Sequence, residues 1–310
     1  MNTDTLADHC RRIYKIAGAD TILGEGISDQ VIRSYYTRSS FYYRKMHSPE
    51  GAMHAPVSFG QGIPHLYKLQ YQARFVDSLI AKHQYSNVLE LGFGMGFNTR
   101  YLAEKNPTVN FTGIDLTASN VELARKNSKN LPNAHFYQDS FDNPTPTDQR
   151  YDLIFAVETI CHSEDMAGVL ERYSKMLTEN GRLVVFDGFR KKPEPETDPD
   201  LKAYNLLLWG FALKQFYSFD AIVDSKRLDF MNFEEITEYS ENVLPNMQVF
   251  QKGAFKALRF PFILKAAVRL KILPPEFVKQ VAAGLTSAHF LESGYLGYYK
   301  LVLSRKEGIS

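Results

Sequence analysis

Short apolar runs alternate with amphipathic segments of helix length through the middle of the chain. The apolar runs have the length of buried strands and stop at glycine, aspartate or a turn; they cover residues 87–91, 111–114, 134–137, 151–157 and 182–186. Helical spacing of apolar residues marks the segments between them, at 99–105, 118–130 and 166–177. Strands that alternate with helices predict a parallel sheet with helices on both faces.

The regions on either side of this core lack the alternation. Residues 1–75 are rich in Tyr and Arg and show no strong strand pattern, so we predict a helical N-terminal cap there. A charged, Pro-rich loop at 191–196 precedes an apolar helix at 201–217, and two further strands are predicted within 227–236 and at 296–304.

These elements predict an α/β fold with a doubly wound, seven-stranded and mostly parallel sheet. We place this sheet domain at residues 76–310, with a helical lid insertion at about 238–291. The insertion and the N-terminal cap are expected to cover the carboxyl ends of the strands. Ligands of doubly wound sheets bind at that edge.

Composition narrows the class of partner. A net charge of +1 argues against a nucleic-acid substrate. The two cysteines, Cys10 and Cys161, form no CxxC pair, so we expect neither a disulfide framework nor a structural metal site, and a reducing cytoplasm fits. We see no signal peptide and no apolar run of membrane-spanning length. The 13% of aromatic residues indicates either a Phe-rich core or a pocket for an apolar small molecule.

A strand, a glycine-rich turn and a helix follow one another at residues 88–105. Gly92, Gly94 and Gly96 let the backbone approach a ligand closely, and Glu90 stands two residues before the first of them. The position where dinucleotide sites have a third spaced glycine is Phe97, so a pyrophosphate would fit poorly.

Two acids close the next two strands. Asp115 stands where a carboxylate accepts hydrogen bonds from ribose hydroxyls, and Asp139 stands where it could reach an adenine amino group. This arrangement predicts a nucleotide-type ligand. Leu116, Ser140 and Val157, each at or beside a strand end, complete the predicted cofactor-binding set.

The glycine turn resembles motif I, E/D-x-G-x-G-x-G, of the class I S-adenosylmethionine-dependent methyltransferases. Residues 158–162, Glu-Thr-Ile-Cys-His, look like the E-x-x-C-H of the sterol C-methyltransferase branch. The segments 177–186 and 229–245 are similar to turn and strand-six regions of the family. The resemblance spans roughly residues 30–305. It implies S-adenosylmethionine as cofactor, with Glu90 in the network around its methionine moiety.

An upstream element resembles the Y-D-x-S-x-x-F-F of cyclopropane-synthase-like and sterol-type enzymes. It consists of Tyr36-Thr37-Arg38-Ser39 followed by Tyr42-Tyr43, with Thr37 in place of the Asp. The resemblance implies that Tyr36 closes over the cofactor.

The residues after the fourth strand carry the predicted chemistry. The N/D-P-P-Y/F signature of base and amide methylation is absent there, and Glu158 and His162 are the candidate catalytic groups. Each has a plainer interpretation, a capping or cofactor contact for Glu158 and a buried histidine for His162. We predict methylation of a carbon in an isoprenoid-type olefin, a sterol-like lipid or a prenyl diphosphate, with Glu158 as proton acceptor. Mg²⁺ is expected only for a diphosphate.

Two alternatives stay open. One is O-methylation of a hydroxyl on a polyketide or quinone-like molecule, with His162 as base. The other is a non-catalytic, membrane-associated protein of the same fold. The sequence leaves the oligomeric state undetermined.

A basic and apolar segment at 250–280 has three interpretations. Its charged residues are Lys252, Lys256, Arg259, Lys265, Arg269, Lys271 and Lys279, with Glu276 as the acid. The segment forms a solvated helix face, a lid over the substrate, or a docking site on a membrane surface. Its cations, or Arg33, Arg38 and Arg44, could also hold a substrate diphosphate.

Overall fold

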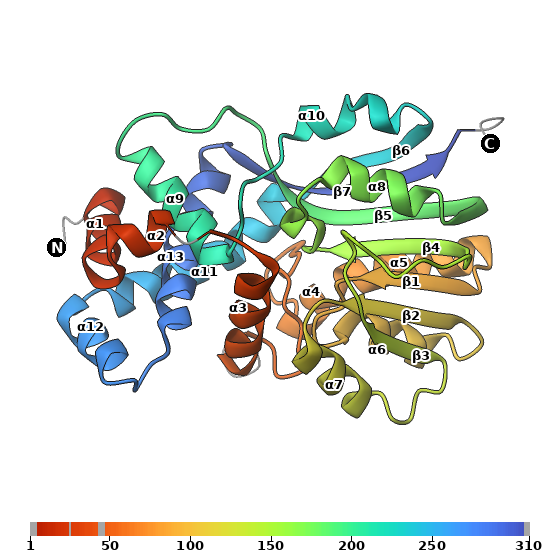
Figure 1. Cartoon of the computed structure of the whole chain (residues 1–310), viewed down its shortest axis with the longest axis horizontal. Helices are drawn as coiled ribbons and strands as arrows, with labels where there is room; N and C mark the ends of the chain where they lie inside the picture. The colour runs from red at the N-terminus through yellow and green to blue at the C-terminus, as the bar shows by residue number, and fades with distance from the viewer. Residues whose placement is uncertain (1–4, 25, 43–46, 307–310) are drawn as a thin grey trace.

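A computed structural model describes residues 5–24, 26–42 and 47–306, without the side chains of residues 39–42. Within this part of the chain lies one seven-stranded sheet with the order β3-β2-β1-β4-β5-β7-β6 (Figure 1). Its strands are β1 (Asn87–Leu91), β2 (Asn110–Asp115), β3 (Ala134–Gln138), β4 (Tyr151–Val157), β5 (Leu177–Arg190), β6 (Met231–Glu238) and β7 (Leu296–Arg305). β1 to β5 pair in parallel, and β7 is antiparallel to β5 and β6.

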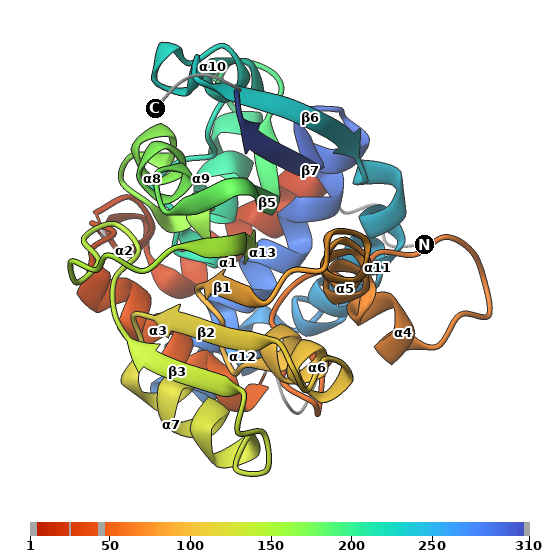
Figure 2. The same cartoon turned by 90° about the vertical axis from the view of Figure 1, so that its right-hand side faces the viewer.

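Alternating side chains of the central strands separate two apolar layers. On β4, Leu153 and Phe155 face the layer of α5 (Tyr71–His83) and α6 (Phe97–Lys105), while Ile154 faces that of α8 (Met166–Ser174). Figure 2 shows α5 and α6 on one side of the twisted sheet and α8 on the other. This is the arrangement that a strand buried on both faces requires.

Another group of helices forms a cap at the carboxyl ends of the parallel strands (Figure 1). They are α1 (Leu6–Ala17), α2 (Ala19–Gly24), α3 (Asp29–Tyr42), α9 (Asp200–Phe211), α11 (Ser240–Ala257), α12 (Pro261–Arg269) and α13 (Pro275–Glu292). The last three lie between β6 and β7. Ile13, Leu207 and Leu285 share one buried cluster, so segments far apart in sequence build this cap together. Short helices complete the structure at α4 (His65–Leu69), α7 (Ala118–Asn127) and α10 (Phe219–Val223).

The predicted fold class is confirmed, with differences at element ends. The helix predicted to end at 177 ends at Ser174, and β5 begins at Leu177 because that residue pairs with Tyr151. β5 also runs on to Arg190, since β7 pairs with it from Arg182 to Arg190.

The cap draws on more of the chain than the pattern indicated. Helix α9 is apolar on most of its surface and packs into the cap, where a Cβ on Gly210 would lie 2.6 Å from the backbone nitrogen of Ala283. Helix α5 runs through residue 75, at which we placed the end of the N-terminal cap; the division into two units stays a prediction. Among the described helices none is both long and apolar enough to cross a bilayer.

Candidate active site

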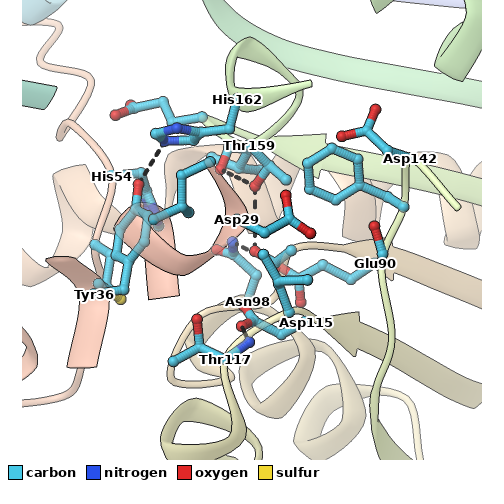
Figure 3. A pocket seen from close by; sticks show the side chains of 18 residues that line it. Asp29, Tyr36, His54, Glu90, Asn98, Asp115, Thr117, Asp142, Thr159 and His162 are labelled. Atoms are coloured by element: carbon cyan, nitrogen blue, oxygen red, sulfur yellow. Dashed lines mark hydrogen bonds between the residues drawn. The ribbon is translucent and has the colours of Figure 1, made fainter. Parts of the chain in front are cut away.

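A cavity of about 90 Å³ opens at the carboxyl ends of β1, β2 and β4, where the strand order reverses (Figure 3). The sheet and its loops contribute Glu90, Gly92, Asn98, Asp115, Leu116, Thr117, Ser140, Phe141, Asp142, Val157, Glu158, Thr159 and His162. The cap and the segment after it contribute Asp29, Ile32, Tyr36, Met53 and His54. The cavity therefore lies at the edge where we expected ligands.

The glycine turn fits tightly between two strand ends. Gly92 has a φ of +63°, and a Cβ there would lie 2.2 Å from Cγ2 of Thr159. Its backbone N–H donates to the Ile114 carbonyl at 2.8 Å. Gly94 and Gly96 also have positive φ but lie outside the cavity lining. Only a residue without a side chain allows this contact between the β1 and β4 ends.

Glu90 is a buried carboxylate at the end of β1. It accepts hydrogen bonds from the Thr99 backbone N–H and from Asn98 Nδ2, both at 3.1 Å, and from the Thr99 hydroxyl. Burial raises the pKa of Glu90 to about 7. In the described structure the buried Asn98 Oδ1 has no hydrogen-bond partner. A carboxylate beside an unpaired amide oxygen can bind a cationic N–H donor.

Asp115 is fixed at the end of β2. One oxygen accepts from the Gly94 N–H at 2.9 Å, and the other accepts from the Thr117 N–H at 2.8 Å. Burial raises its pKa to about 6. The carboxylate thus couples the glycine turn to the second strand, and its predicted role toward ribose stays a prediction.

Asp139 directly follows β3, as expected, and its predicted role toward adenine stays a prediction. Its carboxylate accepts from the backbone N–H groups of Ser140 and Thr145, at 2.8 and 2.9 Å, and it is not among the residues that line the cavity. It folds the loop whose next residues, Ser140 to Asp142, form that wall. Burial and the nearby Asp29 carboxylate raise the pKa of Asp142. Sequence reasoning stopped at the strand end and missed this acid.

Glu158 sits in a strained turn directly after β4. Its φ is +49°, uncommon for a residue with a side chain, and its N–H donates to the Phe186 carbonyl at 2.7 Å. Oε1 accepts from the Ala55 N–H at 2.7 Å, and the carboxylate also meets the Tyr298 hydroxyl. Burial raises the pKa of Glu158 to about 7. Strain of this kind persists where surrounding contacts impose it, often at functional sites.

His162 and Tyr36 form a pair across the cavity. The Tyr36 hydroxyl and His162 Nε2 lie 2.7 Å apart, and Nδ1 points toward the Ala212 carbonyl without completing a hydrogen bond. Burial lowers the pKa of His162 to about 4, so the imidazole is neutral near pH 7. Tyr36 comes from α3, which the pair links to the turn after β4.

Asp187 accepts a hydrogen bond from the backbone of the turn after β4, and sequence reasoning missed this residue. It is 2% exposed, and its oxygens accept from the N–H groups of Cys161 and Gly188, at 3.0 and 2.9 Å. Burial raises its pKa to about 6. An acid directly after the apolar run at 182–186 was the available signal.

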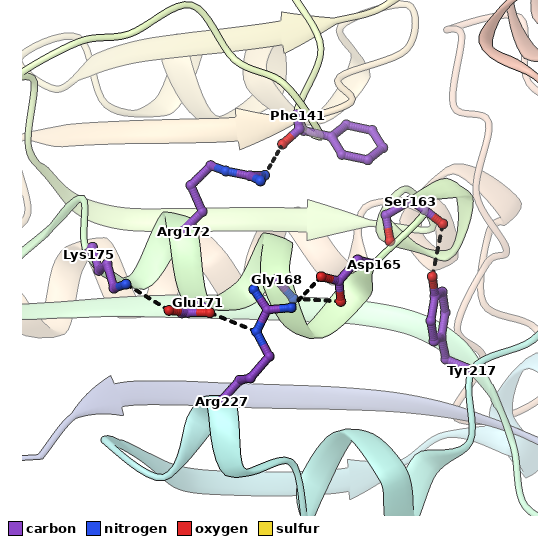
Figure 4. A network of polar contacts seen from close by, with 9 residues as sticks. All are labelled: Phe141, Ser163, Asp165, Gly168, Glu171, Arg172, Lys175, Tyr217 and Arg227. Carbon is purple, nitrogen blue, oxygen red and sulfur yellow. Dashed lines mark hydrogen bonds and ion pairs between the residues drawn. The ribbon is translucent and has the colours of Figure 1, made fainter.

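Polar contacts around α8 anchor two walls of the cavity (Figure 4). Arg172 donates to the Phe141 carbonyl at 3.1 Å, and the Tyr217 hydroxyl donates to the Ser163 carbonyl at 3.0 Å. Arg227 forms ion pairs with Asp165, just before α8, and with Glu171 on that helix. Arg172 thus connects the loop after β3 to α8, and Tyr217 connects the loop after β4 to the segment that follows α9.

The charge of the cavity is one-sided. Among the lining residues that the structure describes are five carboxylates, Asp29, Glu90, Asp115, Asp142 and Glu158, and no Lys or Arg. Each bound positive charge would favour the ionised form of these acids, whose burial otherwise opposes ionisation. The cavity therefore suits a cationic ligand.

Two of the arginines proposed for a diphosphate, Arg33 and Arg38, have partners within the chain. Arg33 donates to the Leu116 carbonyl, and Arg38 pairs with Glu276 at 3.0 Å. Tyr43 and Arg44 lie outside the described residues, as do the side chains of Ser39 and Tyr42. In the ranges the structure covers, no group of three or more His, Cys, Asp or Glu side chains is arranged to hold a metal ion.

Part of the chain is similar to known methyltransferases. Residues 82–206 match the family model described as "Methyltransferase domain". Phosphoethanolamine N-methyltransferase 3 of Arabidopsis thaliana is 29% identical over 141 residues, which are 45% of this chain and 28% of that protein. Sterol 24-C-methyltransferase of Saccharomyces cerevisiae is 22% identical over 288 residues, 80% of this chain and 73% of that protein.

The fold also matches solved structures. A geranyl diphosphate methyltransferase in complex with GPP and sinefungin has a TM-score of 0.64 at 12% identity, over 90% of this chain and 99% of that one. At such identity the likeness shows the fold alone. The chain spans at most 38% of the length of the first curated relatives it matches.

Proposed function

We propose, from the premise that this chain carries a methyltransferase domain of the S-adenosylmethionine-dependent class, that it methylates a carbon–carbon double bond of an uncharged, isoprenoid-type lipid. The observation that carries the proposal is the Glu158 carboxylate, held after β4 in a cavity whose described lining residues include five acids and no Lys or Arg. This deepens the predicted C-methylation and chooses between its two predicted substrate classes.

The residues present fit the cofactor. Glu90 and the unpaired Asn98 Oδ1 would receive the ammonium group of the methionine moiety, and Asp115 would receive the ribose hydroxyls. Leu116, Ser140 and Val157 line the same cavity. When bound, the cofactor supplies a methyl group on a sulfonium cation, which the acid-lined cavity would stabilise.

Charge balance favours an uncharged olefin over a diphosphate. When the π electrons of a neutral olefin form the new C–C bond, the positive charge moves onto a substrate carbon. The Glu158 carboxylate and the Tyr36 and Phe141 rings line the space where that charge would appear. A diphosphate would bring negative charge toward five carboxylates, while Arg33 and Arg38 already have partners.

Glu158 can complete the reaction. A proton leaves the carbon next to the cation, its C–H electrons form the new double bond, and the carboxylate takes the proton. A pKa near 7 suits a base that works at neutral pH. His162 is less suited to this role, because its Nε2 already engages the Tyr36 hydroxyl and its Nδ1 faces the backbone. This argues against the O-methylation alternative.

A second candidate is methylation of a lipophilic amine. An uncharged amine also becomes a cation on methylation, so the five carboxylates favour it for the same reason. Any proton lost in this reaction leaves nitrogen, so no base has to lie beside a substrate carbon. The effect of Glu158 variants on turnover therefore distinguishes amine methylation from olefin methylation.

The test is methyl transfer from isotope-labelled cofactor to a panel of acceptors. The panel contains sterol-like and linear isoprenoid olefins, prenyl diphosphates, lipophilic amines and phenols, and products are identified by mass spectrometry. We expect label on carbon of an uncharged olefin. Label found only on a diphosphate or a phenolic oxygen would overturn the proposal, and label on nitrogen would select the second candidate.

Asp115→Ala should weaken binding of S-adenosylmethionine by at least about tenfold. The variant removes a charged hydrogen-bond acceptor, and each such bond is worth about 1.5–3 kcal/mol. Calorimetric titration with the cofactor measures the change. Asp148→Ala, an exposed aspartate in the loop before β4, is the matched control and should bind as the wild type does. Equal affinity of the Asp115 variant and the wild type would remove Asp115 from the cofactor site.

A further inference from the structure

The outer end of the cap exposes large apolar side chains. Phe260, Phe262, Ile263, Leu270 and Ile272 are 50–71% exposed, and all belong to α12 or the residues that flank it. Figure 1 shows α12 at the end of the molecule away from the sheet. We call residues 256–272 the α12 surface. Clusters of exposed apolar side chains mark interaction sites more often than single ones do.

Helical spacing explains why these side chains face outward. α12 buries Leu264 in the cap cluster and packs against α1, where Lys265 Nζ donates to the Lys15 carbonyl at 3.0 Å. Phe262 and Leu270 stand eight residues apart and so lie on one face of the helix, turned away from Leu264. Lys271, with a φ of +57°, reverses the chain after the helix and leaves Ile272 on the same exterior.

The same region is strongly basic. Residues 250–275 contain no Asp or Glu and six cations, Lys252, Lys256, Arg259, Lys265, Arg269 and Lys271, all exposed. Within the described residues none of the six forms an ion pair. Their charge is therefore available to an anionic partner.

The two ends of the 250–280 segment behave differently. Glu276 and Lys279 are 6% and 7% exposed; Glu276 pairs with Arg38 of α3, and Lys279 lies over the Trp209 ring at 5.4 Å. They belong to the interior of the cap. The outward-facing cations and apolar groups are those of the α12 surface.

We propose that the α12 surface docks on the anionic face of a lipid bilayer. Its Phe, Ile and Leu side chains enter the boundary between headgroups and acyl chains, and its Lys and Arg side chains contact lipid phosphates. A two-fold contact with a second copy would oppose the same cations on both sides, so charge complementarity favours the lipid. The inference rests on this surface alone and stands apart from the substrate.

Co-flotation of the whole chain with vesicles tests the inference. We expect binding to phosphatidylcholine vesicles that contain phosphatidylserine, loss of binding as salt screens the charges, and little binding to phosphatidylcholine alone. Arg269→Glu with Lys271→Glu should weaken binding about tenfold or more, and Phe262→Ser with Leu270→Ser should also weaken it. Lys126→Glu on α7 with Lys129→Glu just after that helix, the same change in charge at exposed positions, should leave binding as it was.

Cofactor titration of each variant verifies that the fold is retained, because these side chains lie outside the cavity lining. The proposal is wrong if the wild type does not bind anionic vesicles, or if the α7 variant loses binding as much as the α12 variant does. It is also wrong if the wild type fails to bind vesicles and sedimentation shows that Phe262→Ser with Leu270→Ser converts a dimer to a monomer. Neither result bears on methyl transfer, which the acceptor panel tests separately.

Discussion

Glu158→Gln is expected to lower turnover on the substrate by roughly 10²–10⁴-fold, the usual contribution of a general base. Glutamine keeps the size of the side chain and can still accept from the Ala55 N–H, but it takes no proton and carries no charge. Affinity for S-adenosylmethionine should change little, because Glu90 and Asp115 supply the predicted cofactor contacts. Single-turnover kinetics with labelled cofactor measure the effect.

The pH profile gives a second readout of the same variant. The pKa of Glu158 is raised to about 7 without cofactor, and the base must be ionised, so wild-type turnover should rise with pH. The midpoint should lie at or below about 7, because the bound cation favours the ionised form. Glu158→Gln should lose this dependence. Glu179→Gln, at an exposed position on β5, is the matched control and should keep both the rate and the profile.

The free energy of unfolding of the wild type should fall as pH rises, whereas its turnover should rise. Because the folded pKa of Glu158 lies above its unfolded value, the stabilisation is complete below the ordinary carboxyl pKa and is lost as pH rises through about 7. Without cofactor, Glu158→Gln should therefore be more stable than the wild type at pH 8, as denaturant unfolding would show.

His162→Ala should lower turnover less than Glu158→Gln does. The reverse ranking would support O-methylation, and wild-type rates in both variants would make the turn structural.

Gly92→Ala is expected to lower cofactor affinity by about 100-fold or more and to cost about 2–5 kcal/mol of stability. Alanine at a φ of +63° is strained, and its Cβ would lie 2.2 Å from Cγ2 and 2.7 Å from Oγ1 of Thr159. Either the glycine turn or the turn that carries Glu158 must shift. Cofactor titration and thermal unfolding measure the two effects.

Two further variants identify the cause of the Gly92 effect. Adding Thr159→Ala removes both closest atoms and leaves Cβ at 3.0 Å, so the double variant should recover part of the lost affinity. Gly253→Ala in α11 is the matched control, since a Cβ there meets nothing within 4 Å, and it should be tolerated. Undiminished cofactor affinity in Gly92→Ala would show that close approach at this turn does not matter.

The sequence by itself determined where the sheet lies and where its ligand-facing ends are. The apolar runs of strand length end at Gly92, Asp115 or Glu158. Their ends can be read locally, because buried strands are apolar and the residues that follow them are not. Because parallel strands end at one edge, these residues had to meet, and all three line the cavity. The same reasoning did not show that Ser140 to Asp142, and not Asp139, line the cavity, because a strand end says nothing of how the following loop folds.

Only the tertiary structure decided which distant groups surround Glu158. The Ala55 N–H, Tyr298 hydroxyl and Asp187 carboxylate come from segments up to 140 residues away from it, and no local pattern relates them. The tertiary structure also separates the two ends of the basic segment. Lys279 is buried because α13 packs inside the cap, whereas Leu270 at the end of α12 is exposed to solvent. Periodicity shows that a helix has two faces, and only the packed cap determines which of them finds a partner.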